Sequence, residues 1–254
     1  MPDLVRVNDL IVLSEDLPQH NLLRGRIGRI LEVTAPDEFY VDFVDDDAHT
    51  ITKIHLKSSQ LAILRHQATL DEGQFWKMVE KAKSDSAGDG ERQVQLLVDR
   101  LAKMSIADIF AFGDIMDGLK DTAYYCELWT AAVIICGGCS DDGFTDFRAW
   151  LIAQGKQIFY DALRDPEILI NVVPIHDDQF GRWGDAQLEH MNYGHWDAYE
   201  KKTGEATPIF FGQHPLPDLR GEWWDDETAQ RNYPKLMAKF RSLPSHEFGE
   251  DVDG

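Results

Sequence analysis

The sequence contains few cysteines, a minority of basic residues and no long apolar run. No apolar stretch approaches the roughly 18 residues that a membrane-spanning helix needs, so we expect no membrane segment. The three cysteines, Cys126, Cys136 and Cys139, are an odd number, which indicates reduced thiols rather than a disulfide framework. The first residues, MPDLVRVNDLIVL, lack the basic and continuous apolar regions of a secretory signal. These absences together predict a cytoplasmic protein.

Acidic residues outnumber basic residues across the chain. Lysine and arginine total 25 against 45 aspartate and glutamate residues, which gives a formal net charge of −20 at pH 7. A protein with this charge repels nucleic-acid phosphates and anionic lipid surfaces, so we expect neither as a partner. A basic protein surface or a metal ion would be attracted. An aromatic content of 11% is too high for a disordered chain, and the sequence therefore predicts a folded protein.

The stretch from 9 to 64 has the pattern of short β-strands. The β-branched runs LIVL, RIGRILEV, FYVDFV and TITKIHL are separated by the turn-forming segments DLPQHN, APDE and DDDAH. Gly25 and Gly28 lie at the start of the second run, where a missing Cβ permits a bulge or a sharp bend. The pattern predicts a small, partly open SH3-like β barrel of five strands over residues 1–67.

Beyond Thr69 the apolar residues follow a helical period. Thr69 to Glu72 has the pattern of a capping box, and an apolar stripe begins at Phe75. The segment SDSAGDGE, residues 84–91, predicts a loop before the second helix, and Ser105 the start of a third. The expected fold class is therefore α+β with several domains: the β barrel, a mainly helical bundle domain over 68–244 and an acidic flexible tail over 245–254.

The apolar segment YYCELWTAAVIIC, residues 124–136, predicts the central buried helix of this domain. The glycines after it end the helix, and the next helical pattern runs over 144–163 with a possible break at Gly155. Asp165-Pro166 has the pattern of a helix start.

From about residue 171 the sequence becomes aromatic and irregular. We expect a helix over 196–202 that ends near Gly204, and one or two further helices over 225–241, broken at Pro234.

The segment CGGCSDDGFTDFRAW, residues 136–150, holds the candidate site. Ser140 or Asp141 caps the following helix, whose positive end keeps nearby carboxylates ionised and so disfavours a general acid. Asp142 and Asp146 are four residues apart and share one helical face, so a cation from another segment would relieve their repulsion. Arg148 is only two residues beyond Asp146 and points elsewhere.

Three interpretations of this segment stay open: helix capping alone, a ligand or partner surface, and a catalytic metal site. Two aromatic side chains outside the segment join the candidate binding set. The complete set is Ser140, Asp141, Asp142, Asp146, Arg148, Trp76 and Trp196.

The cysteine pair and the histidines are weaker candidates. Cys136 lies at the end of a helix, whereas redox CxxC pairs lie at a helix N-terminus, and no second CxxC completes a zinc site with Cys139. Possible ligands near the C-terminus match no metalloprotease or facial-triad spacing. They are His176, Asp177, Asp178, His190, His195, Asp197 and His214. The sequence therefore predicts no bound metal and no cofactor.

Two parts of the chain are similar to families without an assigned reaction. DLIVLSEDLP, LRGRIGRILEV and FYVDFVD, between residues 9 and 64, resemble the bacterial domain-of-unknown-function family 4926, a small β module. Phe75-Trp76 and GGCSDDGFTDFRAWLIAQG, residues 137–155, resemble family 4240, which would cover residues 71–241. The resemblance implies a regulatory or toxin-immunity context, and hence binding rather than catalysis.

The sequence thus favours a non-catalytic binding protein, regulatory or immunity-like, that presents an acidic and aromatic surface to a protein partner. Residues 1–66 carry a net charge of −4, which leaves −16 for the helical part. No GxSxG, P-loop or GxGxxG motif is present. The alternatives are a metal-assisted hydrolase or transferase that uses Asp141, Asp142 and Asp146, and a nucleic-acid reader that uses the basic strip Arg24, Arg26 and Arg29.

Overall fold

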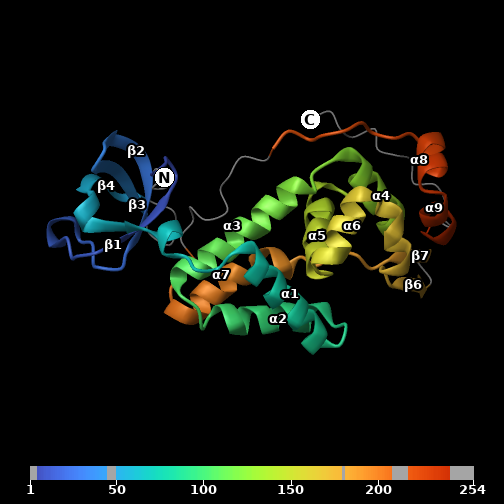
Figure 1. Cartoon of the computed structure of the whole chain (residues 1–254), viewed down its shortest axis with the longest axis horizontal. Helices are drawn as coiled ribbons and strands as arrows, with labels where there is room; N and C mark the ends of the chain where they lie inside the picture. The colour runs from blue at the N-terminus through green and yellow to red at the C-terminus, as the bar shows by residue number, and fades with distance from the viewer. Residues whose placement is uncertain (1–4, 45–49, 179–180, 208–216, 241–254) are drawn as a thin grey trace. The chain divides into compact units, whose positions relative to one another are not determined.

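The computed structural model describes residues 5–44, 50–178, 181–207 and 217–240 (Figure 1). The chain forms two compact units, each assembled from separate stretches of sequence. The first unit comprises Met1–Met78, Val94–Asp117 and Tyr193–Pro215, and the second comprises Val79–Gln93, Gly118–Asn192 and Leu216–Gly254. The domain boundaries at 1–67 and 68–244 remain a prediction from the sequence. The predicted acidic tail over 245–254 lies outside the described residues.

Five strands form one antiparallel sheet in the first unit (Figure 1). They are β1 (Leu10–Leu13), β2 (Ile27–Ala35), β3 (Glu38–Val44), β4 (Thr50–Lys57) and β5 (Leu61–Ile63), accompanied by the 3-10 helices η1 (Pro18–His20), η2 (Ser58–Gln60) and η3 (Leu64–Gln67). The strand order is β4-β3-β2-β1-β5, so among the described strands β4 and β5 are unpaired edges and the sheet is not closed. The predicted five strands are confirmed, and the predicted SH3-like barrel is not.

The core of this sheet comes from alternate strand positions. Val41 and Phe43 on β3 are completely buried, as the alternation of apolar residues predicts. A Cβ built on Gly28 would lie 2.7 Å from Cε1 of Phe43 and 2.8 Å from Cγ1 of Val41, so glycine allows these side chains to approach β2 closely. The register of β2 against β3 shifts between Ile30 and Glu32, so the irregularity lies just beyond Gly28.

Helices follow the sheet along the chain, as the helical period of apolar residues predicts. They are α1 (Glu72–Ser86), α2 (Gly90–Leu101), α3 (Ile106–Thr122), α4 (Cys126–Cys136), α5 (Asp141–Ala153), α6 (Lys156–Arg164), the 3-10 helix η4 (Pro166–Asn171), α7 (His190–Thr203), α8 (Asp226–Asn232) and α9 (Pro234–Phe240). An antiparallel sheet followed by helices makes the fold class α+β, as predicted. No helix in the described ranges is both long and apolar enough to cross a membrane.

Helix α4 is the apolar centre of the second unit, as its sequence predicts. Leu128, Ala131 and Ile135 have no exposed surface. The helix ends because Gly137 adopts a left-handed φ of 71°, and the N–H of Gly137 donates to the carbonyl of Val133. Gly155, with a φ of 99°, separates α5 from α6 at the predicted break.

The start of α1 differs from the prediction. The expected capping box at Thr69 and Glu72 is wrong, because Asp71 and Gln74 form it instead. The backbone N–H of Gln74 donates to Oδ1 of Asp71 at 2.7 Å, and the N–H of Asp71 donates to Oε1 of Gln74 at 2.9 Å. Thr69 is occupied elsewhere, since its N–H donates to the carboxylate of Asp108.

The loop predicted over residues 84–91 is also shorter than expected. Helix α1 continues to Ser86 and α2 begins at Gly90. Asp89 makes this early start possible, because Oδ1 of Asp89 accepts a hydrogen bond of 2.9 Å from the backbone N–H of Arg92.

The segment after residue 171 is more regular than predicted. Strands β6 (Ile175–Asp178) and β7 (Gly181–Gly184) pair as an antiparallel hairpin in this segment. Helix α7 begins at His190, earlier than the predicted start at 196. The predicted end at Gly204, with a φ of 75°, and the predicted break at Pro234 between α8 and α9 are confirmed.

Candidate functional site

The corner between α4 and α5 is an exposed acidic turn. Ser140 caps α5, because its Oγ accepts a hydrogen bond of 3.2 Å from the backbone N–H of Gly143. Asp141 and Asp142 occupy the first turn of α5 and both side chains are exposed. The positive end of the helix stabilises these carboxylates while leaving them accessible to a partner.

Asp146, one turn further along α5, is only half-exposed. Its Oδ1 accepts a hydrogen bond of 3.0 Å from Nδ2 of Asn192, and Nζ of Lys120 lies 3.4 Å from Oδ1 of the same asparagine. Burial and the nearby carboxylates of Glu189 and Asp142 raise the pKa of Asp146, against smaller effects of Asn192 and Lys120. The hydrogen bond to Asp146 therefore comes from the neutral amide of Asn192 on another segment, and not from a cation.

Arg148 is buried beneath the corner, with 3% of its surface exposed. Its guanidinium donates to the carbonyl oxygens of Phe144 and Lys120 and to Oγ1 of Thr145, at 3.3, 3.0 and 3.0 Å. The same group lies 4.8 Å from the ring centroid of Tyr124 and 5.0 Å from that of Phe144. Arg148 therefore supports the corner from inside the unit.

The cysteines beside the acidic turn are not activated thiols. Burial and the Asp185 carboxylate raise the pKa of Cys136 to about 12. Burial and the neighbouring Cys136 raise the pKa of Cys139 above its ordinary value. Both thiols are therefore protonated at neutral pH. Nucleophilic attack and metal binding both require the thiolate.

A stack of aromatic rings lies against the acidic turn. The ring of Trp129 stacks on that of Phe144, in the first turn of α5, with centroids 4.6 Å apart, and its Nε1 donates to the carbonyl of Cys139 at 2.9 Å. The ring of Trp223 lies next to that of Trp129, with centroids 5.1 Å apart and the ring planes tilted by 60°. Trp223 is 56% exposed, so a large apolar side chain of this aromatic cluster reaches solvent. The candidate set from the sequence omitted this residue, because no local motif connects it with α5.

The two tryptophans of that set belong to the first unit. Trp76 is 2% exposed and its Nε1 donates to Oε1 of Glu72 at 2.9 Å, so it is part of the core. Trp196 is half-buried and its ring contacts those of Tyr193 and His195.

The ligand set for a metal-assisted reaction is not assembled in the described part of the chain. There, no three His, Cys, Asp or Glu side chains lie close enough together to hold one metal ion. His190 instead lies 2.7 Å from the carboxylate of Glu91, His195 is buried, and His214 lies outside the described residues.

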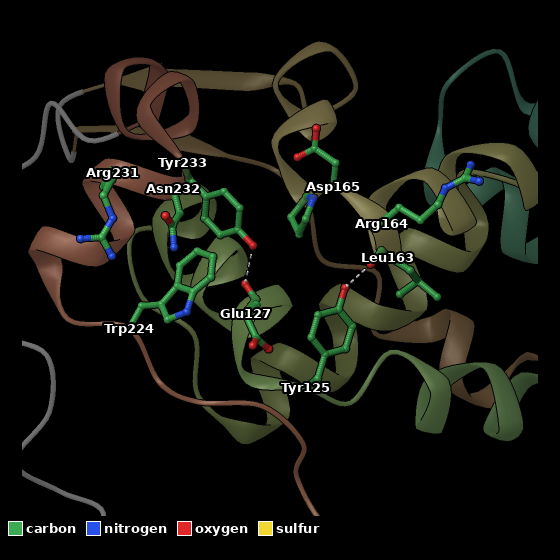
Figure 2. A pocket seen from close by; sticks show the side chains of 10 residues that line it. Tyr125, Glu127, Leu163, Arg164, Asp165, Trp224, Arg231, Asn232 and Tyr233 are labelled. Carbon is green, nitrogen blue, oxygen red and sulfur yellow. Dashed lines mark hydrogen bonds between the residues drawn. The ribbon is translucent and has the colours of Figure 1, made fainter.

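A second feature, which the sequence analysis did not identify, is an open pocket in the second unit (Figure 2). Its volume is about 730 Å³, which is in the range of small-ligand sites. The start of α4, the end of α6, the first residue of η4 and the segment around α8 form its walls. The lining residues are Tyr125, Glu127, Leu163, Arg164, Asp165, Pro166, Trp224, Arg231, Asn232 and Tyr233.

Hydrogen bonds fix the two tyrosines of this pocket (Figure 2). The hydroxyl of Tyr125 donates to the carbonyl of Leu163 at 3.1 Å, and that of Tyr233 donates to the carbonyl of Glu127 at 3.3 Å. Burial and the negative charge of Glu127 raise the pKa of Tyr125, and burial and nearby ionisable groups likewise raise that of Tyr233. Trp224 lies beside Tyr233 with ring centroids 4.6 Å apart, so the pocket has an ordered aromatic wall.

The comparisons with known proteins agree with the two resemblances in the sequence. Residues 70–201 match a family described as a protein of unknown function, DUF4240, and residues 7–63 match a domain of unknown function, DUF4926. The first match ends earlier than the sequence resemblance suggested, before α8 and α9 and the pocket residues that accompany them. No curated protein and no solved structure is significantly similar to the chain.

Proposed function

The chain belongs to the DUF4240 family of proteins of unknown function, and we propose that it is a non-catalytic binding protein that presents an acidic and aromatic surface to a protein partner. The observation that supports this proposal is the position of Trp223. Its exposed ring contacts Trp129, and Trp129 stacks on Phe144 in the first turn of the helix that carries the exposed Asp141 and Asp142. We refer to Trp223, Asp141 and Asp142 as the corner surface.

The chemistry of the corner surface suits a basic protein. Tryptophan is enriched among the residues that dominate protein interfaces, because its large ring loses much water-exposed area on binding. Carboxylates beside it attract positively charged partners and set the orientation of the complex. The net charge of −16 beyond residue 66 extends this attraction over a longer range.

Arg148 has a supporting role in this proposal. Its buried guanidinium holds together Phe144, Thr145 and the end of α3 below the corner surface. The partner would therefore meet Trp223 and the aspartates, while Arg148 keeps the first turn of α5 in position.

We place this function in the cytoplasm and in a regulatory or immunity-like role, in keeping with the reduced cysteines and the family resemblance. The N-terminal sheet, which we propose to be an open variant of an SH3-like fold, would provide a second contact surface or stabilise the chain.

The test is affinity capture from the source cell, followed by binding measurements with the purified partner. The expected partner is basic, and raising the salt concentration from about 50 to about 300 mM should weaken its binding. Trp223→Ala and the double variant Asp141→Asn/Asp142→Asn should each increase Kd by about tenfold or more.

Matched controls separate the corner surface from general effects of charge and apolar area. Glu200→Gln/Glu205→Gln removes the same charge from exposed positions in the first unit, and Leu23→Ala removes an exposed apolar side chain there. Both controls should bind as the wild type does. Equal loss of affinity in the controls and the corner variants would contradict the proposed surface.

A further inference from the structure

The centre of the pocket holds one half-buried carboxylate among aromatic rings. Glu127 lies in the first turn of α4, between Tyr125 and the Trp224–Tyr233 pair in Figure 2. Within the described ranges, no side chain or backbone group donates a hydrogen bond to its carboxylate, and none forms an ion pair with it. A half-buried charge surrounded by rings gains free energy when a ligand supplies the opposite charge.

The backbone beside Glu127 leaves room for this carboxylate. The N–H of Cys126 donates to the carbonyl of Arg220 at 2.8 Å, which holds the 220–221 segment against the start of α4. Gly221 has a left-handed φ of 83°, and a Cβ built on it would collide with the Glu127 carboxylate. A side chain at this position would displace the Glu127 carboxylate, so glycine leaves room for the position that the carboxylate occupies.

The other polar groups at the centre also favour a hydrogen-bond donor. The hydroxyl hydrogens of Tyr125 and Tyr233 are engaged with backbone carbonyls, so both oxygens have only lone pairs to offer a ligand. The rings of Tyr125, Trp224 and Tyr233 present faces of negative electrostatic potential, which attract a cation.

The two arginines of the lining do not neutralise this centre. Arg164 and Arg231 are exposed and extend away from the rings on opposite sides of the pocket in Figure 2. Arg164 forms an ion pair with Asp161, outside the pocket lining. The Asp165 carboxylate is exposed and accepts the N–H of Glu167 at 3.0 Å.

We propose that this pocket binds an arginine side chain from a basic segment of the protein partner. The guanidinium is planar, so it can stack on an aromatic face while two of its N–H groups reach one carboxylate. Glu127 is the anionic acceptor, and Trp224, Tyr125 and Tyr233 form the aromatic wall. This inference rests on the proposed binding function and assigns it a specific anchoring site.

The test uses the full chain and a blocked tripeptide, acetyl-Gly-Arg-Gly-amide, with binding followed by NMR chemical shifts and by tryptophan fluorescence. The control peptide contains citrulline, which has the shape of arginine but no charge. The arginine peptide should bind at least about tenfold more tightly than the citrulline peptide. Equal binding of the two peptides would overturn the proposal.

Two protein variants locate the site. Glu127→Gln keeps the side-chain shape but removes the charge, and Trp224→Leu keeps apolar area but removes the ring; each should weaken peptide binding by about tenfold. Asp226→Asn removes an exposed charge from the first turn of α8 outside the lining and should leave binding unchanged. Unchanged affinity in Glu127→Gln, with an unchanged far-ultraviolet circular dichroism spectrum, would also overturn the proposal.

Agmatine, which carries the guanidinium without a peptide backbone, identifies the source of the cation. A peptide that binds at least as well as agmatine supports a protein segment, whereas binding of agmatine alone would mean that the pocket takes small organic cations. The variants of the corner surface test the proposed function separately from the arginine site. A purified partner that loses affinity with Trp223→Ala but not with Glu127→Gln would retain the proposed function and eliminate the arginine site.

Discussion

The carboxylate of Asp108 accepts hydrogen bonds of 2.6 and 2.8 Å from the backbone N–H groups of Thr69 and Leu70. The hydroxyl of Ser105 also donates to this carboxylate at 2.6 Å, and Asp108 is 6% exposed. Burial opposes the charged form, but the hydrogen bonds outweigh it and hold the pKa of Asp108 below its usual range. One buried carboxylate in the first turn of α3 therefore fixes the chain that leads into α1.

Asp108→Asn should destabilise the protein by about 2 kcal/mol at neutral pH, as measured by urea unfolding. The amide oxygen still accepts from the backbone, but the amide nitrogen cannot accept from Ser105, and the charge is lost. Because the folded-state pKa is lowered, the stabilisation is present above the pKa of the unfolded chain and is lost as pH falls through the folded-state pKa. The two proteins should therefore converge in acid, and equal stability at neutral pH would contradict this account.

Asp146→Asn should have the opposite effect at neutral pH. The raised pKa of Asp146 means that its charged form is disfavoured in the folded protein, so ionisation there lowers the free energy of unfolding. Asparagine keeps an acceptor for Asn192 and removes the repulsion from Glu189 and Asp142. The variant should have a higher Tm than the wild type at neutral pH.

The advantage of Asp146→Asn should shrink as pH falls through the folded-state pKa of Asp146, because the wild-type carboxyl then becomes neutral as well. Asp142→Asn is the control, since the Asp142 side chain is exposed and should change Tm less. A lower Tm for Asp146→Asn at neutral pH would show that the ionised form stabilises the fold.

The thiols of Cys136 and Cys139 should react slowly with a thiol-specific disulfide reagent at neutral pH. Their pKa values are raised by burial first and by neighbouring groups second, so the thiolate fraction is small. Labelling of the folded protein should be at least about a hundredfold slower than labelling of the same protein in urea. If the two thiols react as fast in the folded protein as in urea, or readily form a disulfide with oxidised glutathione, a redox role would be supported again.

The features that the sequence predicts correctly are local. Gly137 ends α4 and Ser140 begins α5 through hydrogen bonds to residues at most four positions away. Such geometry depends on the neighbouring residues alone, so a short motif determines it. The shifted cap at Asp71 shows the limit of this reasoning, because Asp108 on another helix binds Thr69 and removes it from the predicted cap.

The features that the sequence could not predict depend on distant segments. The contact of Asp146 with Asn192 joins residues 46 positions apart, and Trp223 reaches Trp129 from the far end of the second unit's sequence. The pocket likewise unites Tyr125 with Tyr233, and neither lies in a motif. Gly221 comes nearest to a local sequence signal for the pocket, because glycine readily adopts the left-handed backbone found there and leaves room for Glu127.

Arg148 provides the sharpest test of how the corner is held together. Arg148→Ala should destabilise the protein by about 3 kcal/mol, because the carbonyl of Lys120 and the hydroxyl of Thr145 lose a charged donor inside the unit. Arg148→Lys keeps the charge and much of the stem but has one nitrogen in place of three, so an intermediate loss of about 1.5 kcal/mol is expected.

Arg164→Ala is the matched control for these measurements. Arg164 is exposed and its ion pair with Asp161 lies at the surface, so its loss should cost about 0.5 kcal/mol or less. If Arg148→Lys were as stable as the wild type, charge alone would hold the corner and the three-donor geometry would be irrelevant. If instead the free energy of unfolding is lowest for Arg148→Ala, intermediate for Arg148→Lys and highest for the wild type, the planar guanidinium itself connects the end of α3 to the first turns of α5.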